Sequence, residues 1–272
     1  MKKNLQKTFL DNGYFFYNDL FSKDCNEKIL NEISSLANLF VKKIPNLKIK
    51  NKIKKIGDVD KFCKKLEKYN KDYFFNFITL VSSLKTINKL IIDDKIVKLS
   101  SEILKEPKES LLFSRVSFLV NIPKNKRVLY HWHNATNAYP KRNRCINFWM
   151  PILKDKKNNN GTLEICEKSH EVSNYPFLEY KSKSASNSLT QNQIPEELFK
   201  KYKRKKINLK IGSLLGMHNN IVHRSTINNS SECSFVCVFK VWSISKDWTV
   251  SSDLNQKYFI GDSGAGSDIK IT

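Results

Sequence analysis

The histidines are the side chains whose spacing points most directly to chemistry. The 272-residue chain has only five of them, at positions 131, 133, 170, 218 and 223. Residues two apart on a strand point to the same side, so His131 and His133 could reach one cavity, with His223 arriving from a distant strand. Imidazole is a suitable ligand for Fe(II) and Zn(II). By itself the spacing leaves open both a metal site and ordinary packed or surface histidines.

The apolar pattern predicts helices first and strands afterwards. Over the first hundred residues apolar side chains recur at helical spacing, for example Ile29 and Ile33 after a cap at Ser22. A lysine-rich stretch at 42–68 is expected to be exposed. From about residue 110 the period becomes two, which is typical of strands. We expect strands at 114–122, 128–133, 144–150, 162–166, 213–217 and 233–243. Helices followed by many short strands indicate an α+β protein whose second part is a sandwich or barrel.

Charge and composition restrict which classes of partner and which location the protein is expected to have. Lys plus Arg total 48 against 26 acidic residues, a net charge of +22. Only six of the 48 are Arg, whereas phosphate and base recognition favours the planar guanidinium, so nucleic acid is disfavoured as a partner. No apolar run is long enough for a transmembrane helix, and no apolar stretch follows the basic start, so neither membrane insertion nor a secretory signal is expected. Six scattered cysteines are typical of reduced thiols, and we expect a cytoplasmic protein.

Several short motifs occur in a fixed order along the chain. Residues 132–135 (Trp-His-Asn-Ala) are followed by 149–152 (Trp-Met-Pro-Ile), then by 160–170, which begins Asn-Gly-Thr-Leu and ends Lys-Ser-His. Gly-Ser at 212–213 and His-Arg-Ser-Thr-Ile-Asn-Asn-Ser at 223–230 complete the set. Together with Asp-Asn-Gly-Tyr-Phe at 11–15, this series resembles the phytanoyl-CoA dioxygenase (PhyH) family of Fe(II)/2-oxoglutarate-dependent oxygenases.

The resemblance implies a double-stranded β-helix, also called a jelly-roll or cupin-like barrel, with the helical amino-terminal region packed around it. We expect one PhyH-like domain over 1–272, mainly helical over 1–108. The barrel would occupy 109–250 and carry a long polar insertion at 171–206. Residues 251–272 would form a tail.

The resemblance also implies a metal site with one ligand replaced. His133 and His223 would be the two iron-binding histidines, while the family's metal carboxylate, two residues after the first histidine, falls on Ala135. Three alternatives follow. Chloride could fill the vacant place, as in halogenating relatives that carry Ala or Gly there. His131 could complete a three-histidine site. Alternatively the metal site has decayed, and the chain is a non-catalytic jelly-roll binding protein.

A second departure concerns the cosubstrate. The family binds the far carboxylate of 2-oxoglutarate with an Arg roughly ten residues beyond the second histidine, where this chain has Glu-Cys-Ser at 232–234. Lys240 lies six residues beyond Ser234, roughly 20 Å along a strand, and is no simple substitute. Because an unpaired buried dicarboxylate is costly, some cation must serve if 2-oxoglutarate binds. The candidates are Arg115, Arg144 and Arg224.

The function implied is that of a non-haem Fe(II)/2-oxoglutarate-dependent oxygenase acting on an aliphatic C–H bond of a small molecule. A halogenase and a non-catalytic binding protein are the alternatives. The lysines of the helical region and of the insertion are compatible with an anionic substrate, but no motif identifies it.

Overall fold

The computed structural model describes residues 4–126, 129–135, 145–172, 175–176, 178–181 and 190–243, which are called the described residues below. Arg144 and the expected tail at 251–272 lie outside them. The helices are α1 (Leu5–Asn12), α2 (Lys23–Lys43), α3 (Ile56–Tyr69), α4 (Lys71–Ser82), α5 (Lys85–Ile91) and α6 (Asp94–Leu104), with short 3-10 turns η1 (Lys108–Ser110), η3 (Ser169–Glu171) and η4 (Glu196–Leu198).

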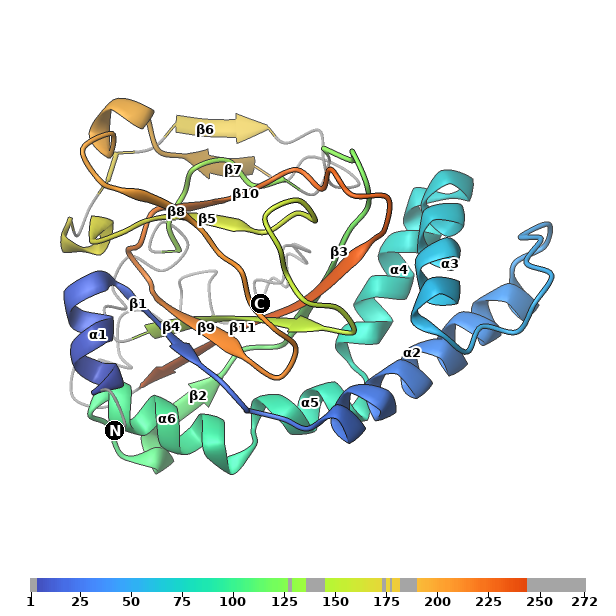
Figure 1. The fold of residues 1–272 in the computed structure, drawn as a ribbon, viewed down its shortest axis with the longest axis horizontal. Helices are drawn as coiled ribbons and strands as arrows, with labels where there is room; N and C mark the ends of the chain where they lie inside the picture. Colours follow the sequence, from blue (N-terminus) through green and yellow to red (C-terminus); the bar gives the residue numbers. More distant parts are fainter. Residues whose placement is uncertain are drawn as a thin grey trace, which may run out of the picture.

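The strands form two facing sheets and a separate hairpin. The larger sheet has the order β1 (Tyr14–Tyr17), β9 (Leu214–His218), β4 (Cys145–Ile152), β11 (Ser234–Ser243) and β2 (Leu111–Phe113), and β3 (Ser117–Asn121) also pairs with β11. The smaller sheet has the order β10 (His223–Ser225), β5 (Leu163–Cys166) and β8 (Arg204–Lys206). All of these pairings are antiparallel, and β6 (Leu178–Lys181) pairs with β7 (Thr190–Gln193). Figure 1 shows the smaller sheet facing the larger one.

Two apolar clusters hold these layers together. Alternate side chains of β4, including Phe148 and Met150, pack with the helices on the outer face of the larger sheet. The opposite side chains, including Trp149, pack with Leu163 and Ile165 of the smaller sheet. Every residue of β4 is buried because both faces of this central strand are covered. Helices around two facing antiparallel sheets confirm the α+β jelly-roll architecture.

The helical region follows its capping and spacing signals. Ser22 accepts a hydrogen bond from the Cys25 amide at the start of α2, and Ile29 and Ile33 are buried as their spacing predicts. Within the described residues, no helix combines the length and the apolar character needed to cross a bilayer.

Three details differ from the sequence-based expectations. The stretch 42–68 is not simply exposed, because α3 buries Phe62 and Leu66 while its lysines occupy the outer face. The described part of 128–133 forms no strand, only a bridge at His133. Finally, the expected insertion at 171–206 ends in β8, which pairs with β5 in the smaller sheet.

Candidate metal centre

His133 and His223 lie side by side. Their backbones form an isolated antiparallel bridge, in which the His133 amide donates to the His223 carbonyl at 3.0 Å and the His223 amide donates back at 2.9 Å. The ring centroids are 4.2 Å apart, with the planes inclined at 50°. On β10, His223 pairs with Ile165, whose side chain points between the two sheets, so His223 points there as well. The two imidazoles therefore meet at the inner side of the smaller sheet.

Backbone carbonyls fix which ring nitrogen carries the proton. Nδ1 of His133 lies 2.7 Å from the carbonyl oxygen of His131, and Nδ1 of His223 lies 2.9 Å from that of Ile221. A carbonyl oxygen only accepts hydrogen bonds, so each Nδ1 must donate one. In a neutral ring this leaves the lone pair on Nε2, which is the arrangement by which backbone carbonyls orient histidine ligands toward metals.

Both rings are held in the neutral form. Burial, followed by the neighbouring His223 and then the charge of Lys240, lowers the pKa of His133 to about 3. Burial and the charge of Lys240 lower the pKa of His223 to about 4. At neutral pH both imidazoles are therefore unprotonated and available as ligands.

Ala135 brings no ligand to this place. Its side chain is buried and its amide donates to the Asn219 carbonyl at 2.9 Å. His131 is exposed, and its carbonyl oxygen accepts the hydrogen bond from Nδ1 of His133. Among the described residues no three His, Cys, Asp or Glu side chains are grouped to hold a metal ion. The three-histidine arrangement is therefore not assembled within this part of the chain.

The expected cosubstrate arginines lie elsewhere. Arg115 is exposed and donates to the Thr79 carbonyl and the Ser83 hydroxyl at the end of α4. Arg224 points away from His223, because alternate residues of β10 face opposite sides. There its guanidinium binds Glu164 at 2.6 Å. Neither arginine faces the histidine pair, and Arg144 is not among the described residues.

Two buried polar side chains near the inner face of the larger sheet, Asn147 and Lys156, were not singled out by the sequence. Asn147 of β4 pairs with Lys240 of β11, and both alternate with side chains that pack under the helices. Asn147 is buried, and its amide oxygen has no hydrogen-bond partner among the described residues. Lys156, in the loop after β4, is also buried, with its ammonium beside Ser234. As one of 42 lysines it carries no local sequence signal.

The remaining motif residues are structural. Gly13 has a φ of +81° and a Cβ there would lie 2.4 Å from the His170 ring, whose Nε2 contacts the Leu10 carbonyl at 2.8 Å. His218 packs against the rings of His170 and Phe9. The amino-terminal motif and the one ending at His170 thus fasten α1 to the barrel, and neither histidine joins the metal centre.

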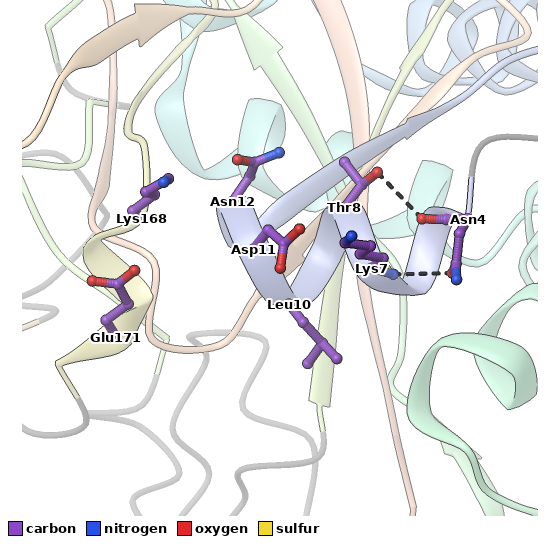
Figure 2. A pocket seen from close by; sticks show the side chains of 8 residues that line it. All are labelled: Asn4, Lys7, Thr8, Leu10, Asp11, Asn12, Lys168 and Glu171. Atoms are coloured by element: carbon purple, nitrogen blue, oxygen red, sulfur yellow. Dashed lines mark hydrogen bonds between the residues drawn. The ribbon is translucent and has the colours of Figure 1, made fainter.

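A pocket of about 580 Å³ lies apart from the histidine pair. It is lined by residues of α1 and the residue before it, together with Lys168 and Glu171. Figure 2 shows these side chains around the helix. None of the five histidines lines this pocket, so it is not the metal centre.

Comparison with known proteins finds the same family that the ordered motifs resemble. Residues 9–234 match the phytanoyl-CoA dioxygenase (PhyH) family. EctD from S. alaskensis, solved with 2-oxoglutarate and 5-hydroxyectoine, is 14% identical with a TM-score of 0.58, over 90% of this chain and 77% of EctD. The epimerase SnoN, solved with Fe3+, alpha ketoglutarate and nogalamycin RO, is 15% identical with a TM-score of 0.58, over 88% of this chain and 82% of SnoN. At such identities the likeness shows the shared fold. No curated protein matches the chain.

Proposed function

This chain belongs to the phytanoyl-CoA dioxygenase family of Fe(II)/2-oxoglutarate oxygenases, and on that premise we propose that it binds Fe(II) through His133 and His223. In this proposal it oxidises an aliphatic C–H bond of a small molecule with 2-oxoglutarate as cosubstrate. The observation that carries the proposal is the pair of neutral imidazoles, each donating from Nδ1 to a backbone carbonyl and keeping the Nε2 lone pair for a metal.

The residues present fit an iron that takes two ligands from the protein. Fe(II) in this class of enzyme is normally held by two imidazoles and one carboxylate on one face of an octahedron. His133 and His223 supply the imidazoles, and Ala135 leaves the third place to an anion or water from solution. Bound iron would supply the redox chemistry that activates oxygen. The chain's own contribution is to orient the two rings through the carbonyls of His131 and Ile221.

The apolar interior supports a reaction shielded from water. Leu163, Ile165 and Leu215 lie between the two sheets and belong to one buried cluster with Trp149. A low-polarity interior strengthens electrostatic interactions with bound anions and excludes side reactions with water. A small apolar substrate portion could therefore be held close to the two histidines.

Ala135 specifically favours a second candidate, a halogenase. Its buried methyl group occupies the place of the anionic ligand in the family's motif, and no group of three ligand side chains forms among the described residues. A chloride ion at this place would restore one negative charge beside the metal. In this alternative the halide rather than oxygen is transferred to the substrate carbon.

One experiment separates these candidates from a non-catalytic binding protein. The chain is loaded with Fe(II), and succinate formation from 2-oxoglutarate is followed without added substrate, in buffers with and without chloride. Slow succinate formation that disappears in His133→Gln and His223→Gln supports the oxygenase. Dependence of this succinate formation on chloride favours the halogenase. Absence of both iron binding and turnover in the wild type would refute both enzymatic functions and favour the binding protein.

Two further expectations remain predictions. An anionic small molecule is compatible as the substrate with the lysines of the helical region and of the insertion at 171–206. A cytoplasmic location is likewise expected from the reduced cysteines, and all six are free.

A further inference from the structure

Lys156 is a buried cation in the barrel. Lys156 is only 1% exposed. Its ammonium lies 5.5 Å from the centre of the Trp149 ring, which packs between the two sheets. The ammonium donates to the Gly161 carbonyl at 2.6 Å and to the Ser234 hydroxyl at 2.5 Å. The backbone of Lys156 is fixed by an antiparallel bridge to Leu209.

The charge of this lysine has no counter-ion among the described residues. Lysine is almost never fully buried unless it is paired with an acid, because removing an ammonium from water is costly. No carboxylate of the described residues forms an ion pair with Lys156, and burial lowers the pKa of its ammonium to about 7. An ammonium has three N–H donors, and two of them are used by Gly161 and Ser234. The third donor is available to an acceptor that the described residues do not provide.

Ser234, which accepts a hydrogen bond from Lys156, stands at a position where related chains have an arginine. Ser234 lies eleven residues after His223, where the motif order places an arginine in related chains. It begins β11, and its side chain faces between the sheets because Phe235 packs on the helical side and Val236 on the inner side. The Ser234 hydroxyl donates to the Asn160 carbonyl at 2.5 Å, so its oxygen is left to accept from Lys156. A cation from another loop therefore stands at the place of the missing arginine.

We propose that Lys156 anchors the far carboxylate of 2-oxoglutarate, in place of the arginine that this chain lacks at Ser234. This inference rests on the proposed function, because it assumes that the other end of the same ligand is held at the metal. The carboxylate would supply the missing counter-ion and accept the third N–H of the ammonium. Ser234 and Gly161 would hold the ammonium in position.

Lys240 is the rival cation on the inner face. It lies six residues beyond Ser234 on β11, roughly 20 Å along an extended strand. On β11 it pairs with Asn147 of β4, whereas Ser234, which accepts from Lys156, begins that strand. Lys156 therefore reaches the place of the missing arginine and Lys240 does not, which favours Lys156.

The test measures binding rather than turnover. The Kd of 2-oxoglutarate is determined by calorimetry on the Co(II)-loaded chain for the wild type, Lys156→Met, Lys240→Met and Lys154→Met. Lys154 is the matched control, because it lies two residues away and pairs with Glu232 at the surface. Loss of a charge-assisted hydrogen bond predicts a Kd raised at least about tenfold in Lys156→Met. The Lys154→Met variant is expected to stay within about threefold of the wild type, and Lys240→Met is expected to lose less affinity than Lys156→Met.

A double variant tests the replacement itself. In Lys156→Ala/Ser234→Arg the arginine returns to the strand and the lysine leaves room for it, so we expect 2-oxoglutarate binding to recover most of what Lys156→Met loses. If Lys156→Met folds poorly, the double variant still shows whether a cation at this place is needed to bind 2-oxoglutarate. Unchanged binding in Lys156→Met, or a loss confined to Lys240→Met, would overturn the inference while leaving the proposed function intact. A wild type that binds Co(II) but not 2-oxoglutarate would overturn both.

Discussion

Replacing Lys156 by Met should change how the stability of the protein depends on pH. Burial lowers the pKa of this ammonium from the ordinary 10.5 to about 7. Each pKa unit corresponds to 1.36 kcal/mol, so the difference amounts to roughly 4–5 kcal/mol by which folding disfavours the charged form. Methionine has a similar length and does not titrate, so it removes this dependence.

The direction follows from proton binding. Between about pH 7 and 10.5 the unfolded chain holds the Lys156 proton and the folded chain has lost it, so the free energy of unfolding rises with pH. This pH-dependent stabilisation by Lys156 is complete above pH 10.5 and declines as the pH falls. It is lost below about pH 7, where Lys156 is protonated in both the folded and the unfolded chain. From pH 7 to 9.5 the wild type should gain about 3 kcal/mol relative to Lys156→Met.

The assay is urea unfolding of the apoprotein, wild type and Lys156→Met, at several pH values between 6 and 9.5. The quantity compared is the difference between the two free energies of unfolding, because other lysines, tyrosines and cysteines titrate equally in both. Lys154→Met serves as the control and should follow the wild type, since Lys154 is only partly buried and pairs with the exposed Glu232. A difference between wild type and Lys156→Met that stays constant with pH would refute the buried, unpaired state of this ammonium.

Three further substitutions test other parts of the structure. Gly161→Ala should lower the free energy of unfolding by about 1–3 kcal/mol, measured by urea unfolding, because φ is +75° and the new Cβ would lie 2.8 Å from the Asn121 amide nitrogen. Asp60→Ala should cost about 2–4 kcal/mol in the same assay, because the buried carboxylate accepts from the Cys233 amide at 2.5 Å; an effect below 0.5 kcal/mol would contradict this. Ala135→Asp should tighten Co(II) binding at least about tenfold in calorimetry, and weaker binding would mean that residue 135 does not face the metal.

The spacing of apolar residues correctly predicted the strands and helices that have one face packed against another layer. The strands expected at 144–150, 162–166, 213–217 and 233–243 appear as β4, β5, β9 and β11 within a few residues. The capped helix after Ser22 also forms as expected. In each case the alternation or the helical spacing reflects one face packed against another layer, which is a local signal. The motif order then placed His133 and His223 together, and the bridge between them agrees.

The rest of the site depends on contacts between distant segments. Arg224 neighbours His223 in sequence, yet strand alternation turns it outward to Glu164. Lys156 lies in an ordinary Lys-Asp-Lys loop and becomes buried only because Gly161 and Ser234 fold around it. The described residues just before His133 make single backbone hydrogen bonds to two different segments, from the Ser225 amide to the Tyr130 carbonyl and from the Ile194 amide to the Trp132 carbonyl, so they form no strand. Apart from the outward side of Arg224, which follows from strand alternation, none of these arrangements leaves a period or a motif in the sequence.

The most direct test of the account is a Co(II) titration of the wild type and of His133→Gln, His223→Gln and His131→Gln. The account predicts one bound ion per chain in the wild type and in His131→Gln, with affinity reduced at least about a hundredfold in each of the other two, because each loses one of two protein ligands. Tight binding that survives in both His133→Gln and His223→Gln would contradict the central claim, as would binding that requires His131.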